Sequence, residues 1–388
     1  MAAPDPGRRG RRIAVVSLHA HRALAPRGER TRHLVARLRR DWEVELVAPP
    51  AAMATGGAAG SGRSSLPRRA AARAVAATLL DKWEPWSARN LGRWQSRVDA
   101  ALLIGHPFSP LVYAARRLRA AGIPYAVDVG DPWVLTTAGH GMRGVALWRA
   151  RRAERRLWQG AAAAVLTTAG QAAGVSEVSP ELATLVRPNG YDGSSPPGEW
   201  AIAPVTAGSP LRIAHFGMFN NQRLDPRPLL ARLAGSGLWS RVSLAQFGDD
   251  FAGFLDRPPA GVEVERHPAY PWQQVLNRAT DFDLAVVVGN VNPSQLPSKA
   301  VQYLTLPIPR LAISRGDDSL AAYLADKPGW LVLGAEREDA PAAVRAHLDR
   351  NWSAAQLDAP RSESWPAVAD AIADFLERRL GAERAGAR

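Results

Sequence analysis

The chain has no cysteine and only three lysines among its 388 residues. The missing cysteines exclude disulfides, thiolate catalysis and cysteine-ligated zinc. No stretch approaches 18 uncharged apolar residues, so the sequence predicts no membrane-spanning helix. The arginine-rich N-terminus runs directly into the short apolar run at residues 13–17, which is too short for the core of a signal peptide. We therefore expect a cytoplasmic protein.

Positive charge is concentrated in the first half of the chain. Residues 1–192 contain 29 Lys+Arg against 14 Asp+Glu, a net charge of +15, whereas residues 193–388 contain 20 against 22, a net charge of −2. This asymmetry predicts an anionic partner for the first half, which would be nucleic acid, an anionic membrane surface or a phosphorylated substrate.

Short apolar runs alternate with amphipathic stretches along the whole chain. This alternation is typical of parallel α/β sheets, and it restarts after a Gly/Pro/Ser-rich stretch that begins at residue 193. We expect strands at residues 13–17, 44–47, 100–104, 125–129, 162–167, 211–216, 242–247, 262–265, 284–288 and 309–313. We expect helices at residues 31–40, 110–121, 145–159, 226–234, 271–279 and 364–380. The sequence therefore predicts an α/β protein with two Rossmann-like domains that face each other across a cleft.

The expected domain limits follow from this pattern. A basic N-terminal Rossmann-like domain would span residues 1–195 and a linker residues 196–210. A second Rossmann-like domain would span residues 211–363. A closing helix at residues 364–380 would pack back toward the first domain.

Residues 292–314 form the most informative stretch. A polar loop after the strand at 284–288 leads into Pro297, Ser298 and Lys299 at an expected helix start. Helix starts that follow strands in α/β proteins present donors to anions, so Lys299 is a candidate anion ligand. The alternative is a lysine that is simply solvated.

A second polar loop follows the strand at residues 211–216. It runs from Gly217 to Pro226 and contains Arg223, just before an expected helix. This position would bring Arg223 and backbone N–H groups near a diphosphate. The alternative is again a solvated arginine.

Five ordered fragments resemble the GT-B glycosyltransferases of family 4, and the resemblance spans nearly the whole chain. Two of them are the strand at 13–17 with Pro26-Arg27-Gly28-Glu29, and the loop 215–226. The other three are residues 122–133, similar to a D-x-R-D-P-W signature, residues 186–192, similar to P-N-G-[YV]-D, and residues 292–314, similar to P-[SG]-K-x-x-E-Y-L.

The resemblance implies a function. It implies transfer of a hexosyl or N-acetylhexosaminyl group from a nucleotide diphosphate sugar to a cell-envelope glycan or lipid-linked acceptor, with retention, without a metal and without a cofactor. The first domain would be the acceptor side and the second would bind the nucleotide sugar. The implied donor-binding residues are Gly217, Arg223, Ser298, Lys299 and Gln302.

Three positions depart from the family pattern. Gln302 stands where the family has a glutamate that binds the ribose, Ser294 stands where the E-x7-E pattern has its first glutamate, and Gly130 replaces an arginine. They keep open the alternative of a degenerate GT-B protein that binds a nucleotide sugar or a partner enzyme without turnover.

The first half offers its own candidates. Asp131 and His106 are candidate catalytic residues, because each follows an expected strand and could take the proton of an acceptor hydroxyl. Asp131-Pro132 is equally explained as a helix cap, and His106 as a loop histidine. Gly28, His19 and Trp133 are candidates for the acceptor side or the cleft.

Residues 63–97 combine arginines with leucines and tryptophans, which suits the interface of an anionic membrane. A nucleic-acid surface is the rival interpretation, but no RRM, KH, zinc-finger or helix-turn-helix signature supports it. A surface helix with solvated arginines is the simplest alternative. We expect a membrane partner through the basic half, a peripheral position at the inner face of the cell membrane, and no nucleic acid.

Overall fold

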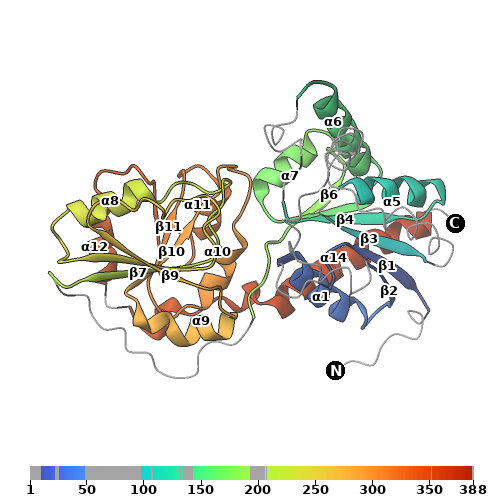
Figure 1. Cartoon of the computed structure of the whole chain (residues 1–388). Helices are drawn as coiled ribbons and strands as arrows, with labels where there is room; N and C mark the ends of the chain where they lie inside the picture. The colour runs from blue at the N-terminus through green and yellow to red at the C-terminus, as the bar shows by residue number, and fades with distance from the viewer. Residues whose placement is uncertain are drawn as a thin grey trace, which may run out of the picture. The chain divides into compact units, whose positions relative to one another are not determined.

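The computed structural model describes residues 10–21, 26–48, 98–105, 108–131, 133, 143–192, 206, 208–350 and 352–386 (Figure 1). The chain divides into two compact units. The first comprises Met1–Asn189 and Pro366–Arg388, and the second comprises Gly190–Trp365.

The first unit is built on a parallel sheet of six strands in the order β2-β1-β3-β4-β5-β6. Strands β3, β4 and β5 are buried throughout and consist mainly of apolar residues, as expected for a parallel sheet covered on both faces. Its elements, in chain order, are β1 (Arg12–Ser17), α1 (Pro26–Leu38), β2 (Glu43–Val47), β3 (Ala100–Gly105), α5 (Phe108–Ala120), β4 (Tyr125–Val129), α6 (Gly144–Gln159), β5 (Ala163–Leu166), α7 (Ala169–Ser176) and β6 (Ala183–Val186).

The last helix, α14 (Trp365–Gly386), returns to the first unit. Arg37 of α1 forms ion pairs with Asp370 and Asp374 of α14, the second at 3.2 Å. The helix continues beyond residue 380, where the sequence pattern placed its end, through Gly386.

The second unit contains a parallel sheet of six strands in the order β12-β11-β10-β7-β8-β9. This is the doubly wound order, in which the chain builds outward in one direction from β7 and then in the other from β10. Its elements, in chain order, are β7 (Leu211–Phe216), α8 (Arg227–Gly235), β8 (Val242–Phe247), β9 (Val262–His267), α9 (Trp272–Arg278), β10 (Leu284–Val288), α10 (Ser298–Gln302), β11 (Arg310–Ile313), α11 (Ser319–Leu324), β12 (Trp330–Leu333), α12 (Ala340–Leu348) and α13 (Ala354–Leu357).

The prediction of two Rossmann-like domains is confirmed by these two sheets. All ten expected strands are present, and β6 and β12 are additional strands that the sequence pattern did not reveal. Helix α1 begins at Pro26 instead of residue 31, so Gly28 lies in its first turn and not in a loop. The expected linker at residues 196–210 falls largely outside the described residues. Among the described helices, none is both long enough and apolar enough to cross a bilayer.

Candidate functional site

The carboxyl ends of β7 and β10 lie next to each other in the second unit. The two strands are paired in parallel, with Leu284 opposite Ile213, although β8 and β9 separate them in the sequence. Such a switch point leaves a crevice at the carboxyl edge of a doubly wound sheet, and ligands bind there. Gly217 follows β7 and Asn290 follows β10, so the loop 217–226 and the loop 289–297 both start at this point.

Arg223 joins these two loops. Its backbone pairs with that of Asn290 in an isolated bridge. Its guanidinium donates hydrogen bonds to Asn290 Oδ1 at 2.7 Å and to the carbonyl of Val288 at 3.4 Å. Burial lowers the pKa of Arg223. Both acceptors are neutral, and no carboxylate in the described parts of the chain forms an ion pair with Arg223, so its positive charge is not neutralised.

Lys299 reaches the same strand end from α10. Its Cγ lies 3.7 Å from the point that a Cβ on residue 217 would occupy, and its Nζ lies 5.0 Å from the ring centroid of Trp272. A glycine at position 217 therefore leaves the side chain of Lys299 room to extend past the end of β7. Lys299 thus lies beside Gly217, and the charges of both Lys299 and Arg223 act on His215 at the end of β7.

The backbone contributes less to this site than the sequence pattern indicates. Helix α10 has only five residues, which is too short to build a strong dipole. The N–H of Gly217 donates to Phe247 at 3.0 Å, and those of Arg223 and Leu224 also donate to carbonyls of the protein. These N–H groups are therefore not available to a ligand. The cationic groups at this strand end are the side chains of Arg223 and Lys299.

A buried chain of hydrogen bonds from His215 through Gln246 holds the backbone carbonyl of Gly217 in place. Nδ1 of His215 bonds Oε1 of Gln246 at 2.6 Å, and Nε2 of Gln246 donates to the carbonyl of Gly217 at 2.6 Å. Because the Gln246 oxygen can only accept, Nδ1 of His215 is the donor. Burial, with the charges of Arg223 and Lys299, lowers the pKa of His215 to about 3. The imidazole is therefore neutral at physiological pH and adds no third charge.

Two further residues fix the shape of this strand end. Gly248 has φ +128°, and a Cβ on it would lie 2.5 Å from the carbonyl oxygen of Gly217, so only glycine fits there. The hydroxyl of Tyr303, just after α10, accepts a hydrogen bond from the N–H of Phe216 at 2.6 Å. It ties the Lys299 segment to β7.

Ser298 and Gln302, the other two predicted donor-site residues on α10, are half-buried like Lys299. They are four residues apart and so lie on one side of the helix. The structure therefore brings all five predicted donor-site residues to the switch point or to α10. It adds Gln246, Asn290 and Tyr303, which the sequence reasoning missed. Asn290 and Gln246 had a usable signal, since each lies at the carboxyl end of an expected strand.

The first unit brings fewer of its candidates together. Asp131 forms an ion pair with Arg27 of α1. Burial lowers the pKa of Arg27 to about 10, still far above neutrality, so the guanidinium stays charged. The carboxylate of Asp131, which a general base would direct toward a hydroxyl, therefore faces the guanidinium of Arg27. His19 follows β1 and is half-buried, and His106 lies outside the described residues.

Trp133 is a core residue. It is 3% exposed and stacks on Phe108, with ring centroids 4.5 Å apart and an interplanar angle of 2°. The sequence pattern placed it at the acceptor side or the cleft, whereas its indole is buried in the hydrophobic core of the first unit.

A buried ion pair near Asp131 was also missed. Nε of Arg30 bonds both carboxylate oxygens of Asp128, at 2.8 and 3.1 Å, and its other nitrogens donate to the carbonyls of Arg187 and Pro188. Both side chains are nearly fully buried. Removing either one would leave an unpaired buried charge, so the pair has a structural role in fixing α1, β4 and the segment after β6.

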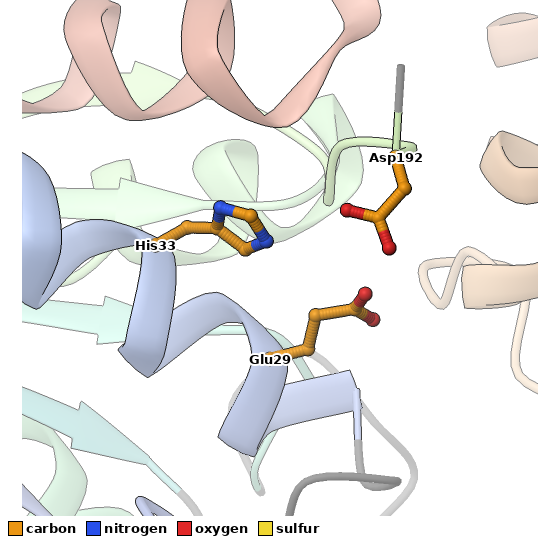
Figure 2. Close-up of side chains that lie close together, drawn as sticks. All are labelled: Glu29, His33 and Asp192. Atoms are coloured by element: carbon orange, nitrogen blue, oxygen red, sulfur yellow. The ribbon is translucent and has the colours of Figure 1, made fainter. Parts of the chain in front are cut away.

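Glu29 and His33 lie one turn apart on α1, and their side chains leave the same side of the helix (Figure 2). Asp192, also labelled there, belongs to the second unit. Two ligands from α1 alone are too few for a structural metal site.

Comparisons with known proteins agree with this architecture. No family model and no curated protein sequence matches the chain. Solved structures do match. Sucrose-phosphate synthase from Thermosynechococcus elongatus superposes with a TM-score of 0.61 at 13% identity, covering 96% of this chain and 100% of its own. HepE from Anabaena, in complex with UDP and glucose, gives a TM-score of 0.53 at 15% identity and 95% coverage of both chains.

The fold is that of the GT-B glycosyltransferases. The lipopolysaccharide outer core galactosyltransferase WaaB, in its apo form, gives a TM-score of 0.53 at 12% identity and again 95% coverage of both chains. The predicted GT-B architecture is thus confirmed for the chain as a whole. The closer resemblance to family 4 stays a prediction.

Proposed function

We propose that this GT-B protein is a glycosyltransferase that takes its sugar from a nucleotide diphosphate sugar. The observation behind the proposal is that Arg223 and Lys299 both lie at the carboxyl ends of β7 and β10, the switch point of the second sheet, where Lys299 passes Gly217, Arg223 is held by Asn290 and both charges act on His215. HepE, a protein of the same fold, has been solved with UDP and with UDP-glucose. Two cations at a switch point match the charge of such a diphosphate.

The same two side chains suit the chemistry of sugar transfer. When the glycosidic bond breaks, negative charge grows on the departing diphosphate, and preorganised cations stabilise that charge. The guanidinium of Arg223 is held in one orientation by Asn290 and Val288, so little reorganisation is needed. Lys299 supplies a compact point charge. With both in place the departing group needs no divalent cation, which supports metal-independent transfer.

The finer assignment rests on the resemblance of the sequence to family 4. We propose transfer of a hexosyl or N-acetylhexosaminyl group, with retention, to a hydroxyl of a cell-envelope glycan or a lipid-linked acceptor. The first unit would hold the acceptor. Asp131, oriented by Arg27, would hydrogen-bond the acceptor hydroxyl instead of removing its proton. We also propose that the protein is cytoplasmic, as its composition predicts.

A second candidate function is nucleotide-sugar binding without turnover. It is favoured by one observation, which is that Gln302 lies on α10 beside Lys299 where the family has a carboxylate. An amide still accepts a hydrogen bond from a ribose hydroxyl but has no charge. Such a protein would bind the donor and present it, or itself, to a partner enzyme.

A two-stage experiment tests the proposal. Thermal melting with UDP, GDP, dTDP and their sugars should show a shift with at least one nucleotide, since a ligand that binds only the folded state raises its stability. Release of nucleoside diphosphate is then measured with that donor over an acceptor panel. Release supports the enzyme, and binding without release supports the second candidate. No melting shift with any nucleotide would contradict both.

A further inference from the structure

Helix α6 of the first unit has an outer face that the proposed donor site does not explain. Its inner face is buried through Ala150, Leu157 and Trp158, as in any helix that covers a sheet. The outer face is different. It combines two large exposed apolar side chains, Val145 at 66% and Trp148 at 60%, with a row of exposed arginines at positions 149, 152, 155 and 156.

These residues lie on one side of the helix. Val145, Trp148, Arg152 and Arg155 follow one another at intervals of three or four residues, which is the spacing of a single helical face. The guanidinium of Arg152 lies 5.7 Å from the ring centroid of Trp148, so cation and indole occupy the same patch. Arg143, just before the helix, and Arg151 on its flank are exposed as well.

Negative charge is absent from this patch. The only acidic residue of α6 is Glu154, which is 1% exposed and accepts a hydrogen bond from Nε1 of Trp158 at 3.3 Å. Within the described part of the chain, no ion pair joins an arginine of α6 to a carboxylate. Among the described residues, no ion pair therefore offsets the positive charge of the α6 arginines.

The neighbouring helix extends the patch. Helix α5 packs against α6 in the first unit (Figure 1). It contains no acidic residue, and its exposed residues include Tyr113, Arg116, Arg117 and Arg119. Together the two helices present nine exposed arginines, counting Arg143, with one exposed tryptophan and one exposed tyrosine. We call the exposed side chains of α5 and α6, with Arg143, the α5–α6 face.

We propose that the α5–α6 face docks on an anionic lipid bilayer. Arginine guanidinium groups bind lipid phosphates, and each cation near an anionic surface adds to the attraction. Tryptophan and tyrosine are enriched at the membrane–water interface, where an amphipathic ring is partly buried among headgroups. Val145 and Trp148 at one end of α6 would enter that layer, while the arginines would stay at phosphate level.

A nucleic-acid backbone explains the arginines but not the apolar side chains. Val145 would gain nothing from a phosphate backbone, and it is the more exposed of the two. A bilayer gives both apolar side chains and the arginines a favourable environment at once. The proposal goes beyond the transferase assignment, because it rests on the exposed side chains of α5 and α6 and on no property of the donor site.

Vesicle flotation of the whole chain tests it. The protein should float with phosphatidylcholine vesicles that contain phosphatidylglycerol and not with phosphatidylcholine alone, and added salt should weaken binding. Arg152→Glu with Arg155→Glu should lower the partition coefficient by about tenfold or more. Trp148→Ser should lower it by about threefold or more without changing its salt dependence.

Matched controls lie in the second unit. Arg257→Glu reverses the charge of one exposed arginine, half the charge change of the double variant, and Phe251→Ser removes a side chain that is 69% exposed. Neither should alter flotation. Unchanged flotation of the α6 variants would overturn the proposal. It would also be overturned if the wild type bound duplex DNA or RNA but not vesicles, and the α6 variants lost that nucleic-acid binding. The nucleotide melting shift, measured without lipid, reports on the donor site separately.

Discussion

The side chain of Lys299 passes the end of β7 at a point where residue 217 has no side chain, with Lys299 Cγ 3.7 Å from where a Cβ on Gly217 would be. Arg223 approaches the same strand end from the other loop and is held there by Asn290 at 2.7 Å. The two cations come from segments about 75 residues apart in the sequence, and the parallel pairing of β7 with β10 brings them together.

The first prediction concerns these two cations. Arg223→Gln and Lys299→Met should each lower kcat/KM for the donor by about 10²- to 10³-fold, because each removes charge stabilisation that grows in the transition state. Steady-state kinetics of nucleoside diphosphate release measure this effect. Without ligand, the melting temperature should change little in Lys299→Met, since Lys299 is half-buried, and should fall slightly in Arg223→Gln, since the buried Asn290 loses its hydrogen bond from the guanidinium. Arg257→Gln, an exposed arginine of the same unit, is the control, and wild-type rates in either site variant would refute the donor-site assignment.

The second prediction contrasts two glycines. At Gly217 the nearest atoms that a Cβ would meet are in the ring of His215, at 3.4 Å, and in Lys299, at 3.7 Å, which are ordinary contacts. Gly217→Ala should therefore fold normally. Gly217→Val should push Lys299 aside and raise KM for the donor.

At Gly248 the same small change should be costly. The residue has φ +128°, and an added Cβ would be 2.5 Å from the carbonyl oxygen of Gly217. Gly248→Ala should lower the free energy of unfolding by about 1–3 kcal/mol. Urea denaturation of the two alanine variants side by side measures the difference. Equal stability of the two alanine variants would show that residue 248 tolerates a Cβ beside the carbonyl of Gly217.

Some features of this site could be predicted from local sequence patterns, whereas others depend on contacts between segments far apart in the sequence. Arg223 and Lys299 could be found because each follows a strand-type run in a polar loop, and a lysine is conspicuous in a chain with only three. The strands themselves were predicted closely, since parallel strands buried on both faces appear as apolar runs.

Side-chain partners could not be found in this way. Trp133 has the sequence context of a cleft residue, yet it stacks on Phe108 in the core. Asp131 has the context of a base or a cap, yet it pairs with Arg27 from a helix that the pattern started five residues too late. The His215–Gln246 bond joins β7 to β8 and requires their register, which no local pattern contains.

The third prediction concerns pH. Burial lowers the pKa of His215 to about 3, below its ordinary value of 6.5. The folded state therefore binds fewer protons than the unfolded state between these two values. The stability that this residue contributes is present above about pH 6.5 and is lost as the pH falls toward 3.

His215→Gln should flatten the fall of unfolding free energy on acidification, as followed by urea denaturation at a series of pH values. Burial lowers the pKa of His347 to about 4, so this second histidine of the same unit also contributes stability that is lost on acidification. His347→Gln should also flatten the profile, while donor-induced melting shifts should change only in the His215 variant. A His215→Gln profile parallel to that of the wild type would show that this histidine is not held neutral.

The fourth prediction concerns the first unit. Asp131→Asn keeps the shape of the side chain but removes the charge that pairs with Arg27. If Asp131 orients the acceptor, KM for the acceptor should rise while the melting shift with the donor nucleotide stays unchanged. A drop in kcat of about 10²-fold or more with no change in acceptor KM would instead indicate a proton-transfer role. Arg27→Gln distinguishes the two further, since it should mimic Asp131→Asn only in the orienting case.

The last prediction concerns Gln302, which separates the two proposed functions. It lies on α10 three residues after Lys299 and is half-buried, in the place where the family has a glutamate. Gln302→Glu should restore a charged acceptor for ribose hydroxyls, and hydrogen bonds to charged groups are stronger than neutral ones by roughly 1 kcal/mol, or about fivefold in affinity. Isothermal titration with the nucleoside diphosphate should therefore show a severalfold lower Kd in the variant. Gln302→Met, which has no acceptor of comparable strength, should bind more weakly than the wild type.

Turnover of the same variants separates the two proposed functions. If the glutamate variant gains turnover that the wild type lacks, the chain is a binding protein that lost catalysis at this position. If both turn over and differ only in donor KM, it is an active transferase that tolerates the amide. Equal Kd values in all three proteins would place residue 302 outside the nucleotide site.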